Sequence, residues 1–198
     1  MTQVVEMEAS RVAPYIRAGR AVFLVVLKGF AGREPIGAYG DLELGSRQHR
    51  DILVSWTIDM QRGLDYLETR SDIDARKIAL MNSSTFEFGA VFAGVDQRYS
   101  SVILIGAGVF PDLLHVPPEV NPLHFMPHIR APKLMLNGRY DDGTPESTAE
   151  PLFRLMRGPK RRSVFIGGHI PPLEIAVPLV NAFLDETLGP VSRNTTAR

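Results

Sequence analysis

The chain has 198 residues and no cysteine, and it carries 22 Lys and Arg residues against 22 Asp and Glu residues. A net charge near zero gives no electrostatic reason to expect binding to nucleic acid or to an anionic membrane. The lack of cysteine excludes disulfides, thiolate metal sites and a cysteine nucleophile, and it fits a cytoplasmic protein. The longest apolar run, residues 21–27, is too short to span a bilayer. We therefore expect one globular domain, residues 1–190, followed by a disordered tail at 191–198.

Apolar runs typical of buried parallel strands alternate with helical patterns along the chain. The first run is "AVFLVVL" at 21–27, which is rich in β-branched residues. Four more follow: "KIALM" from Lys77, "SVILIG" from Ser101, "KLMLNG" from Lys133 and "RSVFIGG" from Arg162. Helical patterns occupy 50–68, 87–95, 146–156 and 172–188. This alternation predicts an α/β fold, with a mostly parallel sheet and helices on both of its faces.

Three side chains that can carry chemistry follow strands of this predicted sheet. Ser84 lies in the short turn after "KIALM", Asp141 follows "KLMLNGRY", and His169 follows "RSVFIGG". In open parallel sheets the active groups gather at the carboxyl ends of the strands. A serine hydroxyl needs a base to remove its proton, an imidazole supplies that base, and a carboxylate orients the imidazole. Ser83 is an alternative nucleophile, and Asp142 is an alternative acid.

Other candidate sites are weaker. His115, His124 and His128 lack the spacing of metal ligands with a carboxylate partner, so we expect no metal site. The stretch "GAGVFP" from Gly106 has two of the three glycines of a dinucleotide fingerprint, and a proline follows them, so we expect no cofactor. The long connection at 110–130 is expected to lie near the binding crevice and to cover it.

The sequence resembles the α/β-hydrolase superfamily, in particular dienelactone hydrolases and prolyl-oligopeptidase-like esterases. It is most similar to hydrolase domains found C-terminal to bacterial serine/threonine kinase domains. The resemblance covers about residues 12–191, and its most specific part is "PKLMLNGRYD" followed by "GGH". It implies a catalytic triad in which Ser84 is the nucleophile, Asp141 the acid and His169 the base, with the Thr85 amide in the oxyanion hole. It also implies a small-molecule, ester-like substrate, with no nucleic acid or membrane partner.

Two features depart from that family. Its strand–turn–helix junction usually reads G-x-S-x-G, whereas this chain has Asn82 and Phe86 at the two glycine positions. The family's first three strands also have no counterpart, so the chain resembles an N-terminally truncated member. The loop that gives the second oxyanion amide is absent with them.

The missing strands affect the expected sheet. The strand at 21–27 would have to pair directly with the strand at Lys77, or an open edge would be left to which a second copy could bind as a homo-oligomer. Residues 2–7 are a candidate for a short replacement strand. Two functions from different classes remain: a serine hydrolase of the carboxylesterase type, or a non-catalytic pseudo-hydrolase or truncated fragment that serves as a binding domain.

Overall fold

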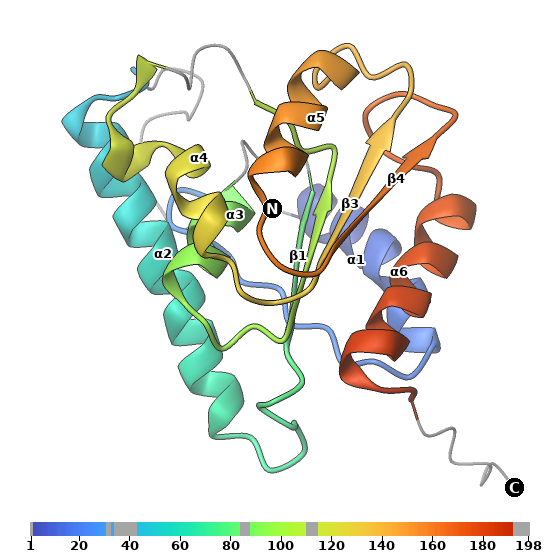
Figure 1. The fold of residues 1–198 in the computed structure, drawn as a ribbon. Coiled ribbons are helices and arrows are strands. Elements are labelled where there is room, and N and C mark those ends of the chain that lie inside the picture. The colour runs from blue at the N-terminus through green and yellow to red at the C-terminus, as the bar shows by residue number, and fades with distance from the viewer. Residues whose placement is uncertain (1, 31–32, 34–42, 84–87, 110–114, 192–198) are drawn as a thin grey trace, which may run out of the picture.

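The structure, a computed structural model, describes residues 2–30, 33, 43–83, 88–109 and 115–191, with side chains from residue 9 onward. Within them the chain forms a four-stranded, fully parallel sheet in the order β1-β2-β3-β4 (Figure 1). The strands are β1 Ala79–Ser83, β2 Ser101–Ile105, β3 Lys133–Gly138 and β4 Lys160–Phe165. The predicted α/β class is therefore confirmed, and β1 runs two residues beyond the predicted "KIALM".

Helices cover both faces of this sheet (Figure 1). They are α1 Thr2–Arg17, α2 Arg47–Glu68, α3 Phe88–Val95, α4 Pro122–Phe125, α5 Glu146–Leu155 and α6 Leu173–Leu188, with 3-10 turns at Pro118–Val120 and Met126–His128. Local chemistry sets several ends. The Ser46 side chain caps α2 by accepting from the His49 amide, and Gly189, with φ of 87°, ends α6. The four predicted helices are confirmed, with ends that shift by at most a few residues. No helix in the described ranges is long and apolar enough to cross a membrane.

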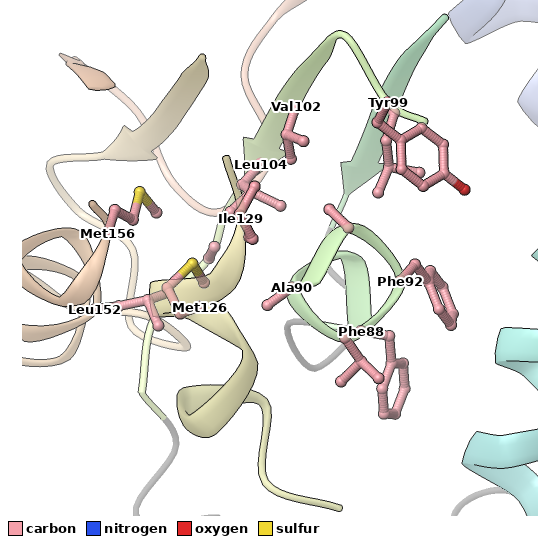
Figure 2. Close-up of a cluster of buried hydrophobic side chains, with 14 of the residues drawn as sticks. Phe88, Ala90, Phe92, Tyr99, Val102, Leu104, Met126, Ile129, Leu152 and Met156 are labelled. Atoms are coloured by element: carbon pink, nitrogen blue, oxygen red, sulfur yellow. The ribbon is translucent and has the colours of Figure 1, made fainter. Parts of the chain in front are cut away.

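The sheet separates two hydrophobic clusters. Val102 and Leu104 of β2 point into the larger cluster, which α2, α3 and α5 close, whereas Ile103 and Ile105 point into a smaller one closed by α1 and α6. Figure 2 shows part of the larger cluster, where side chains from α3, the α4 region and α5 gather on β2. Both faces of β2 are buried, which explains its uninterrupted apolar sequence.

The predictions for the N-terminal part of the chain were wrong in two places. Residues 2–7 belong to helix α1, not to a strand. Val12 and Tyr15, three residues apart, bury one face of that helix, which is a helical spacing.

Residues 21–27 are not a strand either. This segment runs beside α2 and is attached to it through Lys28, whose carbonyl accepts from Trp56 Nε1 at 2.7 Å and whose amide donates to Asp59 at 2.8 Å. Phe23 packs on the ring of Tyr66, with centroids 5.6 Å apart. The segment is therefore held by side chains of a helix and not by a neighbouring strand.

Lys133 is a fully buried cation at the start of β3. Its Nζ donates to the carbonyls of Ile129 at 2.9 Å and Ala131 at 2.7 Å. Burial, with a smaller contribution from the charge of Lys160, lowers the pKa of Lys133 to about 8. The fold therefore disfavours the charged form of this side chain.

We expect Lys133 to make the protein more stable as the pH rises from about 8 to 10.5. In that window the unfolded chain still holds the proton that the folded chain has lost, so raising the pH favours folding, by roughly 3 kcal/mol at most. Urea unfolding at several pH values measures this slope. Lys133→Met should flatten the slope, and an equal slope in both proteins would show that Lys133 is not its cause.

Candidate active site

Asp141 is held in one orientation by the turn that follows β3. Its carboxylate is buried, and Oδ1 accepts from the amides of Gly143 and Thr144, both at 2.9 Å. Oδ2 accepts from Thr144 Oγ1 at 2.5 Å and lies 2.8 Å from His169 Nδ1. Four hydrogen-bond partners therefore surround the two oxygens, which leaves this side chain little rotational freedom.

These contacts keep Asp141 ionised. Burial by itself would raise the pKa of this carboxyl, but the hydrogen bonds from Thr144 and from His169 outweigh burial and lower it. The aspartate is therefore negative at neutral pH and can hold a proton on the facing nitrogen of His169.

His169 lies in the loop after β4, with its ring between Asp141 and the end of β2. A Cβ added to Gly106, the residue after β2, would come within 2.8 Å of His169 Cε1. Gly106 also has φ of +65°, so a side chain at this position is disfavoured on two grounds. With Nδ1 donating to the carboxylate, Nε2 is the nitrogen that carries the lone pair in the neutral ring.

A close approach between two backbones brings Asp141 and His169 together. A Cβ on Gly138, the last residue of β3, would lie 1.9 Å from the carbonyl oxygen of Gly168. Beyond this point the Tyr140 amide donates to Gly167 O at 2.9 Å. The turn with the aspartate and the loop with the histidine are therefore joined directly by their main chains.

The predicted nucleophile Ser84 and the predicted oxyanion residue Thr85 lie outside the described residues, as does Phe86. The chain before them is β1, which ends at Ser83, and the chain after them is α3, which begins at Phe88.

The structure explains how a helix can pass close to Asn82. Gly89 in α3 packs against this residue, since a Cβ on the glycine would lie 2.7 Å from Asn82 Cβ. The small residue that permits the approach is Gly89 of the helix, which is at neither of the two positions, Asn82 and Phe86, where the sequence pattern led us to look for a glycine.

Two further residues of the site were not predicted. Thr144 hydrogen-bonds to Asp141 through both its amide and its hydroxyl, and Gly106 supports the His169 ring. Thr144 had a local signal, because an aspartate often accepts from amides two and three residues later in a turn. Gly106 had been considered only for a dinucleotide fingerprint, and its contact with His169 depends on tertiary structure.

The structure describes both alternative residues and the three histidines of the long connection. Asp142 is exposed, and Ser83 is the last residue of β1. His115, His124 and His128 are all exposed. Among the residues that the structure describes, no three His, Asp or Glu side chains are grouped in a way that could hold a metal ion.

The fold of this chain is similar to that of several solved esterases and of a dienelactone hydrolase. Acetyl xylan esterase 1 from a Thermoanaerobacterium species matches 90% of this chain with a TM-score of 0.69 and 16% identity. An acetyl xylan esterase from a Paenibacillus species matches 73% with a TM-score of 0.58 and 20% identity. Dienelactone hydrolase from Anabaena variabilis matches 68% with a TM-score of 0.52 and 19% identity.

These similarities are similarities of fold. The aligned region is only part of each of the other proteins. This chain spans 69% of the Thermoanaerobacterium enzyme, 57% of the Paenibacillus enzyme and 59% of the dienelactone hydrolase. No family model and no curated protein sequence matches the chain.

Proposed function

We propose that this chain is a serine hydrolase that cleaves an ester or a related acyl bond of a small molecule. The observation that carries the proposal is the pairing of Asp141 with His169 at 2.8 Å, at the carboxyl end of the sheet. A buried, ionised carboxylate that faces Nδ1 of an imidazole orients the ring and stabilises its protonated form. The three solved enzymes named above have names that describe ester or lactone hydrolysis, which supports the same class of substrate.

The position of Ser84 in the chain supports it as the nucleophile. It directly follows Ser83, which is in register with Ile105 of β2. The residue after Ile105 is Gly106, which lies against His169. Neighbouring strands are about 4.8 Å apart, so the chain leaves β1 beside the imidazole.

The proposed reaction has two steps. His169 Nε2 takes the proton of the Ser84 hydroxyl as the oxygen attacks the substrate carbonyl, and the protonated ring then gives that proton to the leaving alcohol. The Thr85 amide would donate to the oxyanion. Water then attacks the acyl-enzyme with the same base, which releases the acid and restores Ser84.

A second candidate function is that of a non-catalytic member of the fold that binds a ligand or a partner. The presence of Asn82 and Phe86 at the junction favours it. Both candidates are consistent with the fold, so the distinction depends on whether Ser84 is activated.

Labelling with a fluorophosphonate probe tests this directly. We expect the protein to label and to hydrolyse a short-chain aryl ester, because an activated serine does both. Ser84→Ala should abolish labelling and turnover, whereas Ser83→Ala should leave both largely unchanged. Full turnover in Ser84→Ala would assign the nucleophile elsewhere, and a folded protein that neither labels nor turns over would favour the non-catalytic candidate.

A further inference from the structure

A cavity of about 700 Å³ lies next to the outer edge of β1. Residues of β1 line one side, and the segment at 20–25 lines the opposite side. Met60 and Leu64 of α2 lie on one face, while Tyr15 of α1 and Val180 of α6 lie on the other. The cavity therefore continues the plane of the sheet, between the same two helical layers that cover the strands.

The edge of β1 that faces this cavity has no strand partner within the described residues, where β1 pairs with β2 alone. The carbonyl of Ile78 accepts from the Ser100 amide at 2.7 Å, so the polar groups of every second residue point to β2. Successive residues of a strand point their amides and carbonyls in opposite directions. The main-chain groups of Ala79 and Met81 therefore face the cavity.

The two outer strands of the sheet differ in charge. β4 carries Lys160, Arg161 and Arg162, and charged side chains of this kind discourage a further strand from pairing with an edge. β1 has the sequence "ALMNS", with no charged residue. The β1 edge therefore lacks the protection that β4 has.

Among the residues that the structure describes, the segment opposite β1 also has no partner strand. Residues 21–27 are apolar and β-branched, yet Phe23, Leu24 and Val26 are 41–48% exposed. Exposed apolar side chains are unfavourable in water, and so is a strand edge whose main-chain groups have no strand to pair with. An occupant of the cavity would cover the two at once.

We propose that this cavity is a docking groove for one apolar β-strand from polypeptide outside these 198 residues. A row of amides and carbonyls calls for a partner with its own row of them, which a strand has and a lipid or small apolar molecule lacks. A five-residue strand, at 3.3 Å per residue, 4.8 Å between strands and 10 Å between layers, fills about 800 Å³, close to the size of the cavity.

The lining also defines the chemistry of the strand. Both faces of the groove are apolar, so the strand should be apolar on both sides and not alternating. Charged residues lie at the end of the groove where β1 begins, among them Arg70, Asp74 and Lys77, which suits a polar residue at one end of the strand.

The fold comparison is consistent with polypeptide as the occupant, although the argument for a strand is the row of main-chain groups on β1. The Thermoanaerobacterium enzyme matches 90% of this chain, yet the chain spans only 69% of that enzyme. A solved protein with this fold thus carries polypeptide that these 198 residues do not match. The proposed docking concerns binding alone and does not depend on catalysis.

The experiment uses the synthetic peptide KVIVIVK, capped at both ends, and a second copy N-methylated at its five central amides. We expect saturable binding of the first peptide with one site per chain and a rise in melting temperature. N-methylation should weaken binding by at least about tenfold, since it removes the donors that pair with β1. Met81→Pro, which removes an amide facing the groove, should weaken binding, and Met81→Leu should not.

Three results would overturn the proposal. Equal binding of both peptides would make the cavity an apolar ligand site without strand pairing. A chain that dimerises with rising concentration, and binds no peptide as it does so, would make a second copy the occupant. Absence of binding by the folded protein would leave the groove without the proposed function, whatever the outcome of the fluorophosphonate test.

Discussion

Asp141→Asn should lower the turnover of an ester by about four orders of magnitude, by analogy with the corresponding change in serine proteases. The contacts of Asp141 give the reason. The amides of Gly143 and Thr144 both donate to Oδ1, so an asparagine would place its carbonyl oxygen there. Its NH₂ group would then face His169 Nδ1, which would have to accept and leave the proton on Nε2. The ring would have no lone pair for Ser84.

The matched control is Asp142→Asn, because Asp142 is the neighbouring residue and is exposed. We expect it to keep wild-type turnover and stability. Steady-state hydrolysis and the rate of fluorophosphonate labelling measure both variants, and thermal unfolding checks that each is folded. Similar turnover in Asp141→Asn and Asp142→Asn would remove Asp141 from the proposed mechanism.

The sequence predicted the sheet best where each strand has neighbours on both sides. "SVILIG" and "KLMLNG" are continuous apolar runs, and β2 and β3 are indeed buried throughout. "AVFLVVL" at 21–27 has the same appearance but is not a strand. A strand needs a partner for its hydrogen bonds, and whether one is within reach depends on the rest of the fold and not on the seven residues themselves.

The site was predictable to the extent that it follows chain order. The proximity of Asp141 and His169 was predictable because each follows a strand, and parallel strands end at the same edge of the sheet; their catalytic roles stay a prediction. The roles of Gly106 and Gly89 were not predicted. Gly106 contacts His169, which is distant in the sequence, and Gly89 contacts Asn82 across the junction between β1 and α3. The sequence shows that a glycine has no side chain. Which atom occupies the space where a Cβ would lie is known only from the tertiary structure.

The close approach at Gly138 leads to the last prediction, for Gly138→Ala. The added Cβ would lie 1.9 Å from Gly168 O and 2.6 Å from Gly167 O, and both are main-chain atoms that cannot rotate away. The two backbones must separate, and we expect destabilisation of about 3 kcal/mol, at the upper end for overpacking. For a chain of this length that lowers the melting temperature by about 10 °C. The same movement carries His169 away from Asp141, and a displacement of about 1 Å can reduce turnover a hundredfold.

Gly168→Ala is the matched control, because it adds the same methyl group on the other side of the same contact. A Cβ on Gly168 would have no atom within 4 Å, and its φ is not in the left-handed region. We therefore expect this variant to keep the wild-type melting temperature and turnover. Thermal unfolding and ester hydrolysis, measured on both variants, separate the effect of the contact from that of replacing a loop glycine. Equal losses in the two would mean that backbone freedom, and not the approach of β3 to the histidine loop, is what these glycines provide.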